Sequence, residues 1–196
     1  MKHVFVETNF LVDLLRPFPS RDAKALFSRN DGLNLRLYIP WCSQAEAGRT
    51  LGRVIEEDLG FTDAMMKFAL RRWLADRTAF DKAEIEKVRD LASADRRTAL
   101  TTLEARIQAA VGSMERIDPT EAVVARTLSV FSVKSLKPFD EMVLGAVLAK
   151  ATDLYIAGER DLHFCSLDGD LASKHAPLVD EYASCGLAVH QDFRVA

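Results

Sequence analysis

Four acidic residues of this 196-residue chain stand where a carboxylate can do chemistry: Glu7, Glu46, Asp140 and Asp168. Carboxylates that gather in one place repel one another and raise one another's pKa unless a cation neutralises them. Oxygen ligands favour Mg²⁺ or Mn²⁺ over zinc. If the fold brings these four acids together, the sequence therefore predicts a magnesium or manganese site.

An ion held by these carboxylates would supply a specific chemistry. It generates hydroxide from bound water near neutral pH and stabilises the charge that grows on a phosphate, so hydrolysis of a phosphodiester follows. Each acid also has an ordinary structural explanation, such as a helix N-terminal charge for Asp140 or a turn before glycine for Asp168. A metal site requires all four acids to meet at one place, whereas the structural explanations do not.

The elements that must position the acids alternate between strands and helices. Strands are expected at 4–6, 35–39, 162–166 and 187–190, and helices at about 43–59, 119–130, 138–151 and up to 184. This order predicts an α/β fold with a central, mainly parallel sheet and helices on both of its faces. Glu7 and Asp168 follow strands, and ligands of such sheets bind at the carboxyl ends of the strands.

The stretch from Phe61 to Met114 has a different character, since it lacks proline and shows long helical periodicity. We predict a single domain, 1–196, that contains a helical insert at about 61–114. Two shorter helices carry start signals. Ser20 is expected to cap one, and Asp118, followed by Pro119, is expected to cap the other.

Composition limits the partners and the compartment. Lys and Arg total 26 against 29 Asp and Glu, a net charge of -3, which excludes a globally basic surface but leaves room for a local basic groove. Arg16, Arg49 and Arg53 are the candidates for RNA contacts, although surface salt bridges explain them equally well. The three cysteines suggest neither a disulfide framework nor a thiolate zinc site. No apolar run is long enough for a signal peptide or a membrane span, so we expect a cytoplasmic protein.

Four short segments carry a family resemblance. They read VFVETNFL at 4–11, Ile39-Pro40 followed by Glu46, FDEMVLGA at 139–146, and FCSLD at 164–168. In this order they resemble the acidic motifs of PIN-domain nucleases. Those motifs are an apolar strand ending in Asp-Thr-Asn, an acid after a strand and proline, an acid opening an apolar helix, and a strand ending in Ser or Thr shortly before an Asp. The resemblance covers most of the chain outside the helical insert.

The resemblance implies a PIN-like three-layer α/β/α fold and an endoribonuclease that uses Mg²⁺ or Mn²⁺ to cleave RNA. Its catalytic and metal-binding residues would be Glu7, Glu46, Asp140 and Asp168, and its supporting residues Asn9, Thr8, Glu141 and Asp170. Many small members of the family, the VapC-like proteins, are toxins restrained by an antitoxin. The resemblance therefore also implies an antitoxin protein and a homodimer as candidate partners.

Glu7 departs from the family pattern, which has aspartate at this position. The extra methylene moves the carboxylate outward by about one bond length, and catalysis tolerates only about an ångström of misplacement. The alternative function is therefore a catalytically weak or inactive PIN-like scaffold that binds RNA or protein. For the fourth acid we prefer Asp168 over Asp161 and Asp170, because it directly follows the strand. Asp170 is expected either as a secondary ligand or as the cap of the next helix.

Overall fold

The computed structural model describes the chain except residues 17–18, 76–81, 131–135, 173–175 and 196, and it leaves out some side chains of the two longest helices. The described residues form two compact units. The first consists of residues 1–47 and 107–196, and the second of residues 48–106.

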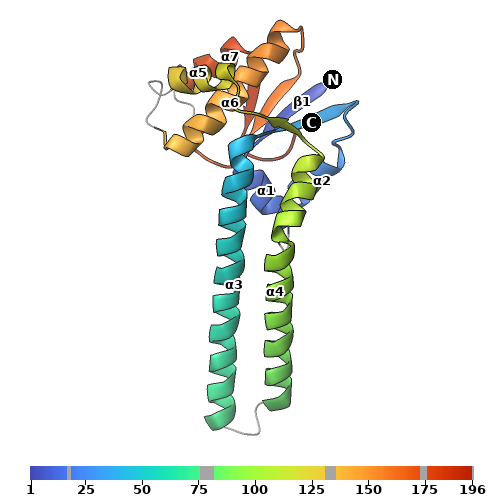
Figure 1. Ribbon diagram of the computed structural model, residues 1–196, viewed down its shortest axis with the longest axis vertical. Coiled ribbons are helices and arrows are strands. Elements are labelled where there is room, and N and C mark those ends of the chain that lie inside the picture. The colour runs from blue at the N-terminus through green and yellow to red at the C-terminus, as the bar shows by residue number, and fades with distance from the viewer. Residues whose placement is uncertain (17–18, 76–81, 131–135, 173–175, 196) are drawn as a thin grey trace. The chain divides into compact units, whose positions relative to one another are not determined.

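A parallel sheet lies at the centre of the first unit (Figure 1). Its strands are β1 (Lys2–Val6), β2 (Leu35–Pro40), β3 (Glu115–Ile117), β4 (Leu162–Cys165) and β5 (Leu187–His190). Their spatial order is β3-β2-β1-β4-β5, and every pairing is parallel. The predicted α/β class and parallel sheet are confirmed. The edge strand β3 was not predicted, because its three residues are too few to show a strand pattern.

The helices flank this sheet or extend from it. The first unit contains α1 (Thr8–Leu15), α2 (Arg21–Ser28), α5 (Glu121–Val130), α6 (Pro138–Ile156) and α7 (Ala176–Ser184). The long helices α3 (Trp41–Ala75) and α4 (Lys82–Gly112) each belong partly to the first unit and partly to the second. None of the described helices combines the length and the apolar character that crossing a membrane requires.

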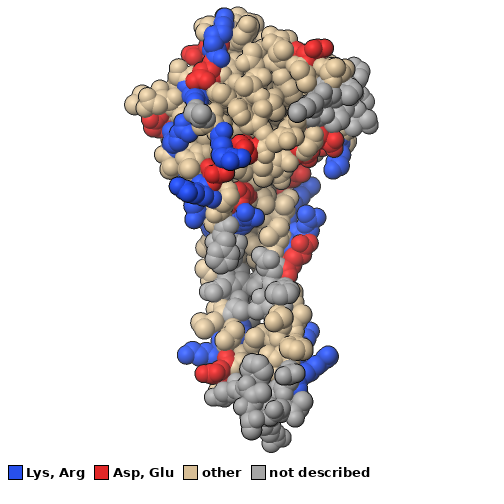
Figure 2. Space-filling model, turned by 180° about the vertical axis from the view of Figure 1, so that it is seen from behind, with Lys and Arg blue, Asp and Glu red and all other residues tan. Residues whose placement is uncertain are grey.

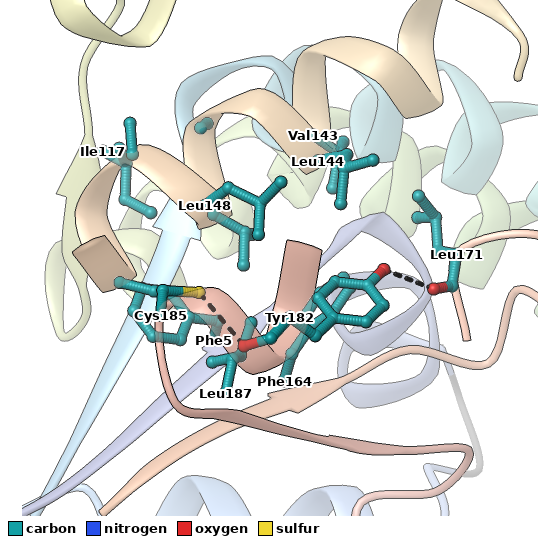
Figure 3. Close-up of a cluster of buried hydrophobic side chains, with 14 of the residues drawn as sticks. Phe5, Ile117, Val143, Leu144, Leu148, Phe164, Leu171, Tyr182, Cys185 and Leu187 are labelled. Carbon is teal, nitrogen blue, oxygen red and sulfur yellow. Dashed lines mark hydrogen bonds between the residues drawn. The ribbon is translucent and has the colours of Figure 1, made fainter. Parts of the chain in front are cut away.

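One face of the sheet packs against α6, which is buried along most of its length. Side chains alternate between the two faces of a strand, and Phe5 and Phe164, which are partners in the register of β1 and β4, both point toward α6. Figure 3 shows Leu144 and Leu148 of α6 in this cluster. Tyr182 of α7 also lies there, and its hydroxyl donates to the carbonyl oxygen of Leu171 at 2.5 Å.

The opposite face of the sheet is equally buried. Val4 and Val6 are fully buried, as are Phe10 and Leu11 of α1. The Phe10 ring meets Phe193, near the end of the chain, edge-on at 5.1 Å between centroids. Helices therefore cover both faces, and the three-layer arrangement is confirmed.

The helix starts agree only in part with the sequence prediction. Ser20 caps α2 as expected, since its hydroxyl oxygen accepts from the backbone N–H of Ala23. Asp118 was expected to cap α5, but this prediction is wrong. The helix begins at Glu121, and Thr120 accepts from the Val123 N–H at 3.3 Å. Asp118 instead forms an ion pair with Arg116 at 2.7 Å, which removes its carboxylate from the helix terminus.

The second unit is made of the middle and distal parts of α3 and α4. A helix was expected to end near Leu59, yet α3 continues without interruption to Ala75. A single glycine inside a helix costs only about 1 kcal/mol, so Gly60 does not end it. The helical insert was expected at residues 61–114, and the second compact unit covers residues 48–106. On the face drawn in Figure 2, acidic and basic side chains are intermixed, in keeping with the small net charge.

Candidate acidic active site

The four acids come from the carboxyl ends of three adjacent parallel strands and from the start of α6. Glu7 and Asp168 follow β1 and β4, while Glu46 lies in the second turn of α3, which starts directly after β2. Asp140 stands in the first turn of α6. Because β2, β1 and β4 are neighbours in one parallel sheet, their carboxyl ends meet at one edge.

Glu7 is an almost fully buried acid, with 3% of its surface exposed. It caps α1, and its Oε2 accepts from the backbone N–H of Asn9 at 2.6 Å. The Ser166 hydroxyl donates to Oε1 at 3.4 Å. Burial is the main reason why the pKa of Glu7 rises to about 7, and the charge of Asp168 adds to the rise. Hydrogen bonds from Asn9 and from the Leu167 backbone oppose it. The Glu7 carboxylate is thus held both by Asn9, close to it in the chain, and by the distant segment that contains Ser166 and Leu167.

Glu46 is fixed by a residue that follows another strand. The Thr8 hydroxyl donates to Glu46 Oε2 at 2.5 Å, joining the start of α1 to the start of α3. Thr8 itself is buried, with 5% of its surface exposed, so its hydroxyl has little access to competing water. This contact holds the Glu46 carboxylate through a buried hydroxyl group.

Asp168 is held by a tight turn of its own loop. Its backbone N–H donates to Ser166 Oγ at 3.1 Å, and its Oδ1 accepts from the Asp170 N–H at 2.7 Å. Ser166 therefore contacts both Glu7 and the backbone of Asp168. Sequence reasoning did not assign Ser166 a role, although its place two residues before Asp168 was the available signal.

Asp140 carries the clearest sign of an incomplete site. Its Oδ2 is buried and has no hydrogen-bond partner among the described residues. The pKa of Asp140 is raised, first by burial and then by the charge of Asp168. Glu46 and Asp170 raise it further, and Lys137 lowers it. Three carboxylates from two other segments of the chain thus lie close enough to Asp140 to repel it.

Whether these acids suit a cation depends on their spacing and on their donor atoms. Within the part of the chain that the structure describes, no three His, Cys, Asp or Glu side chains stand close enough together to hold a metal ion as they are. The donors nevertheless are all oxygens, as Mg²⁺ and Mn²⁺ prefer. A cation would also relieve both the repulsion around Asp140 and its buried, unpaired oxygen. The donor chemistry therefore fits a cation, whereas the described side chains are not spaced to hold one as they stand.

The other predicted supporting residues each lie within two positions of one of the acids in the chain. Asn9 contacts Glu7 through its backbone N–H. Glu141, next to Asp140, is buried rather than directed to solvent, with 5% of its surface exposed. The helix after Asp170 begins only at Ala176, so the expectation that Asp170 caps it is wrong. Asp170 instead lies in the turn of Asp168 and close enough to Asp140 to influence its pKa.

The predicted RNA-binding arginines belong to different units. Arg16, in the first unit, pairs with Asp13 at 2.6 Å between Nη2 and Oδ1. Asp13 is a buried acid that sequence reasoning missed, because it reads as an ordinary polar position of a helix. Arg49 and Arg53 lie in the second unit, where Arg53 pairs with exposed Glu57 at 3.6 Å. An RNA contact by these arginines stays a prediction.

Comparisons with known proteins add little to these observations. No model of a known protein family matches the chain, and no curated protein matches it. Among solved structures, the chain is similar to one in the crystal structure of FitAcB from Neisseria gonorrhoeae, with a TM-score of 0.48 and 13% sequence identity. The match covers 98% of this chain and 99% of that chain. A likeness this distant says nothing about activity.

Proposed function

We propose that this protein is an endoribonuclease that hydrolyses RNA phosphodiester bonds with the help of Mg²⁺ or Mn²⁺. The observation that carries the proposal is the buried Oδ2 of Asp140, which has no hydrogen-bond partner among the described residues and lies near the carboxylates that raise the pKa of Asp140. Structural acids usually pair with a cationic side chain or a hydrogen-bond donor. This one faces other acids, an arrangement that a bound cation stabilises.

Within this proposal each residue has a defined task. Asp140, Asp168 and Glu46 would supply oxygens to the cation, which when bound activates water and stabilises the charge on the phosphate. Thr8 orients Glu46 through its 2.5 Å hydrogen bond. The Asn9 N–H and the Ser166 hydroxyl donate to the Glu7 carboxylate and hold it in place.

The test is cleavage of a mixed-sequence, single-stranded RNA by the purified protein with Mn²⁺, with Mg²⁺ or with a chelator. We expect cleavage that requires the metal and is lost in Asp140→Asn. A matched control is Asp180→Asn, which changes an exposed acid of α7. Cleavage that is insensitive to the chelator, or equal in Asp140→Asn and the parent, contradicts the proposal.

A second candidate function is an inactive PIN-like scaffold that binds RNA or protein. The state of Glu7 favours it, because both carboxylate oxygens already accept hydrogen bonds and the pKa near 7 leaves the group about half protonated at neutral pH. The variant Glu7→Asp separates the two functions. Faster metal-dependent cleavage by Glu7→Asp would show that glutamate weakens an active site. RNA binding without cleavage in both proteins would support the scaffold.

The family resemblance extends the proposal to a narrower biological role. The protein would be the toxin of a toxin–antitoxin pair, with an antitoxin protein and a second copy of the chain as partners. Expression of the parent is then expected to arrest growth of a host cell, while Asp140→Asn at equal protein level does not. Normal growth with a parent protein that is active in vitro would argue for a nuclease outside such a pair.

A further inference from the structure

A second feature of the first unit is a cavity of about 420 Å³ beside the acidic site. Its lining includes Asn9, Arg16, Asp22, Leu167, Asp192 and Phe193. Two of these residues, Asn9 and Leu167, lie within two positions of the acids Glu7 and Asp168. The Asn9 N–H donates to Glu7, and Leu167 stands between Ser166 and Asp168. The cavity therefore adjoins the acidic site at Asn9 and Leu167.

The apolar part of this cavity includes an exposed leucine. Leu167 is 48% exposed, although its neighbour Ser166 is fully buried. Val12 and Phe193 add apolar surface to the lining. An exposed aliphatic side chain next to the acids offers an apolar contact for a flat ring, and the unstacked bases of single-stranded RNA present such a ring.

The polar part of the cavity carries more acid than base. The described lining residues contribute three carboxylates, those of Asp13, Asp22 and Asp192, and one guanidinium, that of Arg16. Arg194 offsets part of this excess of negative charge. Its Nη2 lies 2.8 Å from Asp192 Oδ2, and its Nε lies 3.7 Å from Asp22 Oδ2. The remaining negative charge disfavours a phosphate. A neutral group that carries N–H donors fits better.

The three carboxylates differ in how much of their accepting capacity is free. Asp13 accepts from the backbone N–H and the hydroxyl of Ser20 and pairs with Arg16. Asp192 accepts from the backbone N–H and the guanidinium of Arg194. Among the described residues, the one ion-pair partner of the Asp22 carboxylate is Arg194, at 3.7 Å, and 46% of the Asp22 side chain is exposed. Asp22 is therefore the carboxylate most available to a ligand.

We propose that this cavity binds one unpaired nucleobase of the RNA, next to the cleaved phosphodiester. Leu167 contacts the face of the base, and Asp22 accepts a hydrogen bond from an amino group at its edge. Adenine, cytosine and guanine carry such an amino group, whereas uracil does not. The inference rests on the proposed nuclease function and adds to it a requirement for single-stranded RNA and a preference against uracil at one position.

The first test is cleavage of single-stranded RNA oligonucleotides that carry adenine, cytosine, guanine, uracil or no base at each position around the cut. At one position adjoining the cut, we expect uracil to slow cleavage about tenfold and the abasic residue to slow it further. Asp22→Asn is expected to remove most of the discrimination against uracil. Leu167→Ala is expected to bring all four bases near the abasic rate, and Leu128→Ala, at an exposed leucine of α5, is the matched control.

A binding measurement separates failure of this inference from failure of the nuclease proposal. In chelator, the affinity of a fluorescently labelled RNA is measured by anisotropy with a base or an abasic residue at the same position. The base site is upheld without a nuclease if the parent protein does not cleave RNA but binds the RNA with a base more tightly than the abasic RNA. In that case the Leu167→Ala variant should bind the two RNAs equally. Cleavage that is equal for all bases and for the abasic residue overturns the base site while the nuclease stands. Equal rates for uracil and the other bases overturn the role of Asp22.

Discussion

Thr8 and Glu46 are joined by a 2.5 Å hydrogen bond although 38 positions separate them in the chain. Thr8 follows β1, and Glu46 follows β2, so the bond connects two segments at the same edge of the sheet. It fixes the carboxylate of a long, flexible side chain in one orientation. The position of Glu46 is therefore determined by β1 as much as by its own helix.

The first prediction concerns this bond. Thr8→Val keeps the shape of the side chain and removes the donor, so Glu46 loses its orientation. We expect the affinity for Mn²⁺, measured by calorimetry, to fall by about tenfold or more, as replacement of a group that orients a metal ligand usually does. Thr8→Ser restores the hydroxyl and is expected to stay close to the parent. Equal Mn²⁺ affinities for the valine and serine variants would show that the bond has no orienting role.

The second prediction concerns the repulsion around Asp140. Asp140→Asn removes a negative charge that Asp168 and Glu46 oppose, so the metal-free protein is expected to become more stable, by roughly 0.5–1 kcal/mol because water screens part of the interaction. The measurement is urea unfolding in chelator. Added Mn²⁺ should raise the melting temperature of the parent but much less that of the variant. A variant that is less stable than the parent in chelator would mean that Asp140 makes a stabilising contact.

The third prediction concerns the dependence of stability on pH. The pKa of Glu7 is 4.5 in the unfolded chain and about 7 in the folded protein, so the folded state binds the proton more tightly. Protonation of Glu7 therefore stabilises the folded state in full below pH 4.5, and this stabilisation is lost as the pH rises to 7. Without metal, this loss amounts to about 3 kcal/mol of unfolding free energy.

The variant Glu7→Gln isolates this contribution, because glutamine has nothing to titrate. In chelator, urea unfolding of the parent and of Glu7→Gln is compared between pH 4.5 and 7. We expect the parent to lose more stability than the variant over this range. Glu121→Gln, at an exposed residue of α5, should follow the parent. Parallel curves for the parent and Glu7→Gln would show that Glu7 titrates at its ordinary pKa.

Much of the fold was predictable because the strands are apolar and separated by helices. The runs ending at Val6 and Cys165 have this pattern, and a parallel sheet brings their carboxyl ends together. That rule alone places Glu7 next to Asp168. The cap of α5 was not predictable, since Asp118 and Thr120 are both good capping residues and the pairing of Asp118 with Arg116 decides between them.

The details of the site were less predictable than its location. The sequence shows that Glu7 follows a strand, but its near-complete burial and raised pKa depend on the loop around Ser166, far away in the chain. Likewise, nothing in the order of residues indicates that Thr8 reaches Glu46. Leu167 was unremarkable in the sequence because its exposure is a property of the folded loop.

The last prediction concerns Gly145, where α6 and α5 pack closely. A Cβ at this position would lie 2.1 Å from Thr127 Oγ1 and 2.6 Å from Thr127 Cα. The second atom belongs to the backbone, so rotation of a side chain cannot relieve the clash and the two helices must separate. We expect Gly145→Ala to lower the unfolding free energy by about 1–3 kcal/mol in urea unfolding.

A matched control is Gly52→Ala in α3, where a Cβ meets nothing within 4 Å. Alanine is favoured over glycine inside a helix, so this change should raise the stability by about 0.5–1 kcal/mol. Because α6 carries Asp140 in its first turn, Gly145→Ala should also weaken Mn²⁺ binding, which Gly52→Ala leaves unchanged. If Gly145→Ala stabilises the protein as Gly52→Ala does, α5 and α6 do not pack as closely as the 2.6 Å distance between a Cβ at position 145 and Thr127 Cα implies.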